Sequence, residues 1–134
     1  MKLVLATQNP KKLKEMNEIL SHLGVEVVSE AELGVRIEVE ETGETFTDNA
    51  RLKATAVMQA TGLPAVADDS GLCVDALNGG PGVYSARFGG EGLDDKGRYT
   101  LLLEMLRGQT DRAAHFHTSI VCAFPNGDEL VCEG

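Results

Sequence analysis

Residues 64–72 read Pro64-Ala65-Val66-Ala67-Asp68-Asp69-Ser70-Gly71-Leu72. The apolar run over 64–67 predicts a buried strand, and two carboxylates and a hydroxyl follow where that strand is expected to end. Open α/β sheets place their ligand sites at such carboxyl ends, where strands pass into loops. Two adjacent acids repel each other unless a cation or a proton lies between them. The segment therefore predicts a ligand site, with a solvated turn capped by an Asp side chain as the alternative.

A similar junction lies at the N-terminus, where the segment 2–6 predicts a short strand and a helix follows it. Asn9 is a good N-cap and Pro10 suits the first helical position, so the helix is expected to begin there. Gly24 is placed to end it. The helix carries an apolar stripe, and its members are Leu13, Met16, Leu20 and Leu23.

The start of this helix favours an anion. A strand that feeds a helix presents free backbone N–H groups and the positive end of the helix dipole. The hydroxyl of Thr7, the amide of Asn9 and the ammonium groups of Lys11 and Lys12 lie at the same place in the sequence. Lysines there oppose the dipole unless an anion offsets them. The segment predicts a phosphate-binding loop that is not a Walker loop, and an ordinary turn with a basic first helical turn is the alternative.

The remaining pattern predicts one α/β domain over residues 1–134, with a mixed sheet flanked by helices and a long strand and hairpin toward the C-terminus. The hairpin turn is expected at 125–128. The expected elements are strands at 25–28, 72–77, 113–124 and 129–132, an extended segment at 35–39, an irregular turn at 78–82, and helices at 47–61 and 94–107.

Composition limits the function. The formal net charge of −9 argues against a partner that is nucleic acid or an anionic membrane, because such binders need a basic surface. No stretch approaches a membrane span, and the N-terminus lacks a signal-peptide pattern. Cys73, Cys122 and Cys132 are odd in number and form no Cys-x-x-Cys pair, so they predict reduced thiols in a cytoplasmic protein. His115 and His117 share a strand face without a third ligand, which favours an exposed sheet face over a metal site.

Five blocks, in this order, resemble the non-canonical purine nucleoside triphosphate pyrophosphatases, the inosine/xanthosine triphosphate pyrophosphatases of the Ham1-like family. The first block fits the family's Thr/Ser-x-Asn-x-x-Lys signature. Five blocks in the family's order make the match highly specific, although each block alone is weak. The blocks are Leu5-Ala6-Thr7-Gln8-Asn9-Pro10-Lys11-Lys12, Glu40-Glu41-Thr42-Gly43-Glu44-Thr45-Phe46, Asp48-Asn49-Ala50-Arg51-Leu52-Lys53-Ala54, Ala67-Asp68-Asp69-Ser70-Gly71-Leu72 and Gly80-Pro81-Gly82-Val83-Tyr84-Ser85-Ala86-Arg87-Phe88.

The resemblance implies hydrolysis of inosine, deoxyinosine or xanthosine triphosphate to the monophosphate and pyrophosphate, which cleanses the nucleotide pool. It implies Mg²⁺ as cofactor, with Glu40 and Asp69 as ligands and Asp69 also as the proton acceptor. It leaves open whether Glu41 or Asp68 shares the metal. The implied substrate contacts are Thr7, Gln8, Asn9, Pro10, Lys11, Lys12, Lys53 and Ser70.

The resemblance also implies a homodimer and exposes one departure. Relatives continue through a Phe-Gly-Tyr-Asp-Pro-like segment and a Ser-His-Arg segment that enclose the purine, and this sequence stops at Gly134 before them. We therefore expect the 134-residue form to keep the scaffold, to bind and hydrolyse nucleotide weakly, and to cover its open sheet edge with a second copy. The alternatives are a nucleotide-binding or assembly module without full catalysis and a Maf-like pyrophosphatase. The Maf-like proteins carry Ser-Pro-Arg-Arg where this chain has Asn9-Pro10-Lys11-Lys12.

Overall fold

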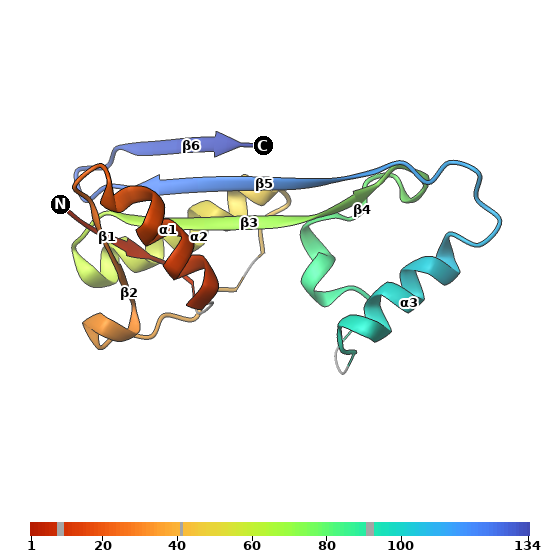
Figure 1. The fold of residues 1–134 in the computed structure, drawn as a ribbon, viewed down its shortest axis with the longest axis horizontal. Coiled ribbons are helices and arrows are strands. Elements are labelled where there is room, and N and C mark those ends of the chain that lie inside the picture. The colour runs from red at the N-terminus through yellow and green to blue at the C-terminus, as the bar shows by residue number, and fades with distance from the viewer. Residues whose placement is uncertain (8–9, 41, 91–92) are drawn as a thin grey trace. The chain divides into compact units, whose positions relative to one another are not determined.

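The structure, a computed structural model, describes residues 1–7, 10–40, 42–90 and 93–134 (Figure 1). Helices and strands alternate over the first part of the chain, as the sequence predicts. The elements in chain order are β1 (Lys2–Leu5), α1 (Pro10–Ser21), β2 (Glu26–Ser29), η1 (Ala31–Leu33), α2 (Phe46–Thr61), β3 (Ala65–Val74), η2 (Asp75–Leu77), β4 (Gly80–Pro81), η3 (Gly82–Arg87), α3 (Asp95–Met105), β5 (Ala114–Ala123) and β6 (Glu129–Glu133), where η denotes a 3₁₀ helix.

Two compact units make up the chain. The first comprises Met1–Asp69 and Ser119–Gly134, and the second comprises Ser70–Thr118. This division does not test the expectation of a single domain over 1–134, which stays a prediction. Among the helices that the structure describes, none has the length and apolar character needed to cross a membrane.

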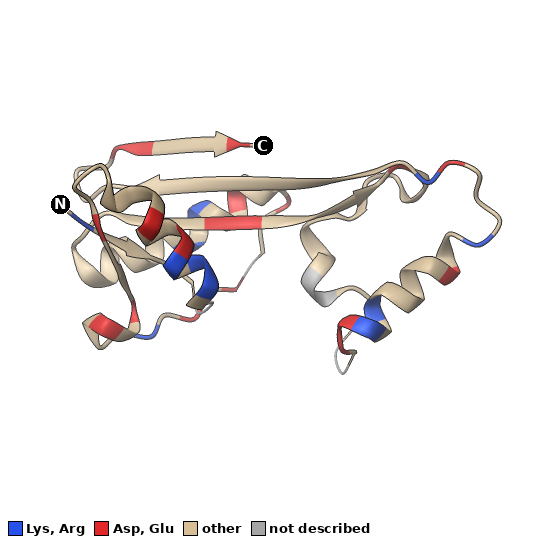
Figure 2. Ribbon diagram, in the orientation of Figure 1, with Lys and Arg blue, Asp and Glu red and all other residues tan. Residues whose placement is uncertain are grey.

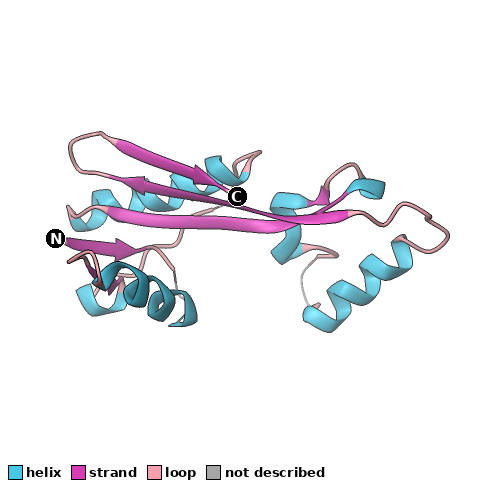
Figure 3. Cartoon of the chain, turned by 45° about the horizontal axis from the view of Figure 1, so that its top comes forward, coloured by secondary structure: helices cyan, strands magenta, loops and turns pink. Residues whose placement is uncertain are grey.

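The sheet has the strand order β2-β1-β3-β5-β6, and β4 pairs with β3. β1 runs parallel to β2 and to β3, and β5 and β6 form an antiparallel pair with Val121 opposite Val131. Figure 3 shows this pair as the hairpin near the C-terminus. The predicted mixed α/β fold with a C-terminal hairpin is confirmed.

Helices α1 and α2 cover opposite faces of the sheet in the first unit (Figure 1). Successive strand residues point to opposite faces, so β1 supplies both cores at once. Leu3 and Leu5 belong to the core under α1, whereas Val4 belongs to the core under α2 and is fully buried. The core under α1 also contains Val27, Val66, Leu13, Met16 and Leu20, and the core under α2 also contains Val28, Ala50, Ala54, Val57, Ala65, Ala67, Val121 and Ala123.

Helix α1 begins at Pro10, as predicted, and ends at Ser21. Its predicted N-cap, Asn9, lies outside the described residues. Leu23 was a wrong member of the apolar stripe: it follows the end of the helix and is 74% exposed. Gly24, with a φ of 74°, occupies the left-handed region that glycine adopts at low cost, and it turns the chain toward β2.

Strand β3 differs from its prediction. The expected end after Ala67 was wrong, because the strand continues through Asp68 and Asp69 to Val74. Its parallel pairing with β1, however, covers only Ala65 and Val66. The two acids therefore follow the carboxyl end of β1, although their own strand continues. The two acids therefore lie at the predicted edge of the parallel part of the sheet, but within a strand and not in a loop.

The second unit contains the other departures. The predicted strand at 72–77 is the end of β3 followed by η2. The expected irregular turn at 78–82 contains β4, whose residue Pro81 pairs with Cys73. Helix α3 was predicted from 94, and Asp94 is its N-cap, with a side chain that accepts a hydrogen bond from the Gly97 N–H.

Candidate active site

A basic side chain from α1 reaches the acidic segment of β3. Lys12 Nζ lies 2.8 Å from Asp68 Oδ2, and the side chains of the two residues are 41% and 20% exposed. In Figure 2 the start of α1 is coloured blue for basic residues, and part of β3 is coloured red for acidic residues. Such a half-exposed pair contributes little to stability, so its main effect is to direct the ammonium group.

A second lysine reaches the same residue from the other face of the sheet. Lys53 Nζ, on α2, donates a hydrogen bond to the backbone carbonyl of Asp68 at 2.5 Å. The two helices lie on opposite faces, yet both ammonium groups meet at Asp68. Both ammonium groups are therefore held at this edge of the sheet, where they lie beside the acidic pair Asp68 and Asp69.

The neighbouring acid, Asp69, is held by a buried amide. Asn49 Nδ2 donates to Asp69 Oδ2 at 3.2 Å, and Asn49 Oδ1 accepts the Gly43 N–H at 2.8 Å. The Asn49 side chain lies in the first turn of α2 and is fully buried. One side chain therefore connects Asp69, the predicted proton acceptor, with the loop that follows Glu40.

The loop approaches α2 too closely for any side chain at position 43. A Cβ on Gly43 would lie 2.6 Å from Asp48 Cβ and 2.7 Å from Asn49 Oδ1. Nearby, the Thr42 N–H donates to the Glu40 carbonyl at 3.0 Å. The φ of Gly43 is not in the left-handed region. Glycine is therefore needed at this position for the close approach and not for its backbone conformation.

The residues expected to hold Mg²⁺ supply carboxylate oxygens, which are the ligands that this ion prefers. Glu40 is exposed and Asp69 is half-buried. Within residues 1–7, 10–40, 42–90 and 93–134, no group of three or more His, Cys, Asp or Glu side chains could hold a metal ion. Mg²⁺ is commonly held by one or two carboxylates together with substrate phosphates and water, so this donor set fits it.

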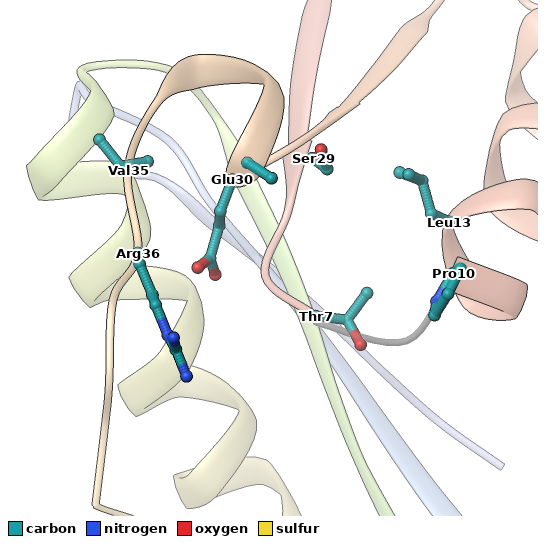
Figure 4. Close-up of a pocket in the computed structure, with 8 residues that line it drawn as sticks. Thr7, Pro10, Leu13, Ser29, Glu30, Val35 and Arg36 are labelled. Carbon is teal, nitrogen blue, oxygen red and sulfur yellow. The ribbon is translucent and has the colours of Figure 1, made fainter.

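A pocket of about 420 Å³ opens beside the start of α1 (Figure 4). Thr7 and Pro10 line one side of it, and Glu30 and Arg36 line the other. The Glu30 carboxylate points into the space between Thr7 and Arg36 in Figure 4. Glu30 is only 7% exposed and accepts the Ile37 N–H at 3.3 Å. Glu30, Thr7 and Lys53 also line an adjoining cavity of about 320 Å³.

The predicted substrate contacts are placed unequally. The structure brings Lys12 and Lys53 together at Asp68, next to Asp69, and Thr7 and Pro10 line the pocket at the start of α1. Lys11 is exposed. Ser70 is exposed and is the first residue of the second unit. The predicted contacts Gln8 and Asn9, and Glu41 as a possible metal ligand, lie outside the described residues. None of these roles is tested, so each stays a prediction.

Two residues of the site were missed by sequence reasoning. Asn49 had a usable signal, because it is the one polar member of the stripe that α2 buries: Phe46, Asn49, Ala50, Ala54 and Val57. A buried amide in an apolar stripe requires hydrogen-bond partners. Glu30 had no such signal, since the group that its carboxylate contacts, the Ile37 N–H, lies in a loop seven residues further along the chain.

Helix α2 is fixed at both its start and its side. The Thr45 side chain accepts the Asp48 N–H at 3.0 Å as an N-cap. Arg51 makes a bidentate contact with Glu129 of β6, with Nε–Oε2 and Nη2–Oε1 distances of 2.9 Å. The hydrogen bond from Arg51 lowers the pKa of Glu129, and the same bond raises the pKa of Arg51. These contacts orient the helix that supplies Asn49 and Lys53.

Comparison with known proteins identifies the family. A sequence model of the Ham1 family matches residues 3–134. A dITP/XTP pyrophosphatase of Desulforamulus reducens is 53% identical over 136 residues, which cover the whole chain and 68% of that relative. One from an Exiguobacterium species is 48% identical over 134 residues, with the same coverage. The solved structure of a HAM1 protein from Coxiella burnetii has a TM-score of 0.94 at 43% identity and covers the whole chain and 70% of that protein.

This alternating α/β scaffold, with lysines and acids at the edge of its parallel strands, belongs to the Ham1 family. The chain spans about two thirds of the length of the relatives that it matches. Membership in this family sets aside the Maf-like alternative.

Proposed function

We propose that this protein hydrolyses dITP, ITP and XTP to the nucleoside monophosphate and pyrophosphate. The observation that carries the proposal is the convergence of Lys12 and Lys53 on Asp68, immediately beside Asp69. The names of the relatives, dITP/XTP pyrophosphatases at about half identity, support the substrate class.

The chemistry requires a neutralised phosphate chain and an acceptor for a proton. Lys12, Lys53 and Thr7 bind phosphate oxygens and hold the anhydride in place. Water forms a new bond to the α-phosphorus. The bond between this phosphorus and the oxygen that bridges the α- and β-phosphates breaks, and its electron pair leaves with pyrophosphate. Asp69 takes the proton from the attacking water, and Ser70 contacts the substrate.

Mg²⁺ is part of this proposal, with Glu40 and Asp69 as the residues that would hold it. When bound, it neutralises charge on the phosphate chain. The hydrogen bond from Asn49 fixes one oxygen of Asp69, and the contact between Asn49 and Gly43 fixes the loop that follows Glu40. We also propose that the protein is a homodimer and that it acts in the cytoplasm. Sedimentation analysis tests the oligomeric state.

Pyrophosphate release from dITP and XTP tests the activity. We expect release from both nucleotides with Mg²⁺ and none after chelation with EDTA. The rival function is a nucleotide-binding module without catalysis. Calorimetric binding of dITP without any pyrophosphate release would favour that module and contradict hydrolysis.

A further inference from the structure

We propose that Asn49 is a positioning residue, which sets Asp69 and the Glu40 loop (residues 40 and 42–45) in one fixed arrangement. The proposal rests on the proposed function of Asp69 and Glu40 and deepens it. Asn49 does not touch the substrate in this account. Its effect on the reaction passes through the two groups that it holds.

The first argument is burial. Asn49 is 0% exposed on a helix face that otherwise carries apolar residues. An amide in such a place costs free energy unless its donor and acceptor are both satisfied. An alanine or leucine would fill the same position without that requirement, so packing alone does not explain an asparagine.

The second argument is the pair of partners. The donor end binds Asp69 Oδ2 and the acceptor end binds the Gly43 N–H. Asparagine is the shortest side chain that carries both a donor and an acceptor in one planar group. An aspartate in its place would keep the acceptor for Gly43 but would put a second negative charge against Asp69.

The third argument is the close fit of the loop. The Gly43 backbone packs so tightly against Asp48 and Asn49 that no Cβ fits there. Thr45, at the other end of the loop, is the N-cap of α2, and its carbonyl accepts the first backbone hydrogen bond of the helix from the Asn49 N–H at 3.2 Å. Residues 43–45 therefore have little freedom to move apart from Asn49.

These contacts lead to a functional expectation. Partners that orient a ligand or a general base leave substrate binding largely intact and control the chemical step. We therefore expect Asn49 to influence kcat more than the KM for nucleotide. A purely structural role would instead lower the fraction of folded protein.

The experiment compares Asn49→Asp and Asn49→Leu with Gln59→Glu, a matched change of an exposed amide on the same helix. Hydrogen exchange at the Gly43 amide, followed by NMR, reports the loop contact without any activity. Steady-state kinetics with dITP report kcat and KM.

We expect Asn49→Asp to keep the Gly43 amide protected and to lower kcat by about 10–100-fold, with KM little changed. Asn49→Leu should lose both the protection and the kcat, and Gln59→Glu should lose neither. Wild-type kcat in Asn49→Asp, or unchanged exchange in Asn49→Leu, would overturn the proposal. Unfolding of both variants, read by circular dichroism, would assign Asn49 to stability alone and overturn it too. A wild-type protein that hydrolyses neither dITP nor XTP would refute the proposed function, while the exchange data would still report the contact.

Discussion

Lys12 and Asp68 are 56 positions apart in the sequence, yet Nζ of one lies 2.8 Å from Oδ2 of the other. The carboxylate holds the ammonium group of α1 over the edge of the parallel strands. A phosphate that arrives there meets a cation that is already oriented, which reduces the entropy lost on binding. In the proposed reaction the Lys12 ammonium group therefore contacts both the Asp68 carboxylate and a phosphate of the substrate.

The oriented lysine gives the first prediction. Lys12→Ala should raise the KM for dITP by roughly ten- to a hundredfold, the equivalent of about 1.5–3 kcal/mol for a hydrogen bond to a charged group. Lys14→Ala is the matched control, since Lys14 is an exposed lysine on the same helix. Initial-rate kinetics measure both. Equal effects of the two substitutions would show that the start of α1 is only a basic surface.

The two adjacent acids should behave differently. Asp69→Asn should lower kcat by about a hundredfold or more, because it removes the proposed proton acceptor. Asp68→Asn should have a smaller effect, and mainly on KM, because its carboxylate contacts Lys12. The measurement is pyrophosphate release at saturating dITP. A comparable loss of kcat in Asp68→Asn alone would move the proton acceptor by one residue.

Gly43 should be sensitive to the smallest possible side chain. Gly43→Ala places a Cβ 2.6 Å from Asp48 Cβ, so the loop or the helix must shift. We expect the free energy of unfolding to fall by about 1–3 kcal/mol, the usual scale for overpacking. Urea denaturation measures it, and Thr42→Ala, at an exposed position of the same loop, is the control. Wild-type stability in Gly43→Ala would contradict the close packing of the loop on Asn49.

The ion pair between Arg51 and Glu129 should depend on pH. Arg51 lowers the pKa of Glu129 in the folded protein, so the stabilisation is present above the pKa of the unfolded carboxyl and is lost as the pH falls through the folded value. The pair is partly exposed, so a double-mutant cycle with Arg51→Gln and Glu129→Gln should give about 0.2–1 kcal/mol at neutral pH. In acid the coupling should vanish. A coupling energy that does not change with pH would rule out this assignment.

The cysteines of the hairpin should differ in reactivity. Burial raises the pKa of the Cys122 thiol, whereas Cys132 is exposed. The thiolate is the reactive form, so iodoacetamide should modify Cys132 well before Cys122. Peptide mass spectrometry after timed alkylation gives the order. Equal rates would mean that the β5–β6 hairpin opens readily.

Local signals in the sequence predicted the first unit well where caps and periodicity agree. Pro10 gave the start of α1, and the helix predicted at 47–61 corresponds to α2, which begins one residue earlier and is closed by Gly62 in the left-handed region. The hairpin turn at 125–128 followed from its composition. These features depend on residues close in sequence, which a local pattern can capture.

Features that depend on distant partners were missed. β3 continues through Asp68, Asp69 and Ser70, residues that do not favour a strand by themselves, and its neighbours in the sheet include β5 and β4. The meeting of Lys12 and Lys53 at Asp68 was equally hidden, since it requires two helices on opposite faces of the sheet. The candidate residues were therefore predictable one by one, whereas their contacts were not.

The first unit is assembled from two separate stretches of chain, with Ser70–Thr118 between them. A ribosome delivers residues in order at about 5–20 per second, so β1, β2 and β3 emerge long before β5 and β6. Until residues 119–134 leave the exit tunnel, Ala65 and Ala67 lack the core partners Val121 and Ala123. One edge of β3 therefore stays without its partner strand β5 while the intervening unit is synthesised.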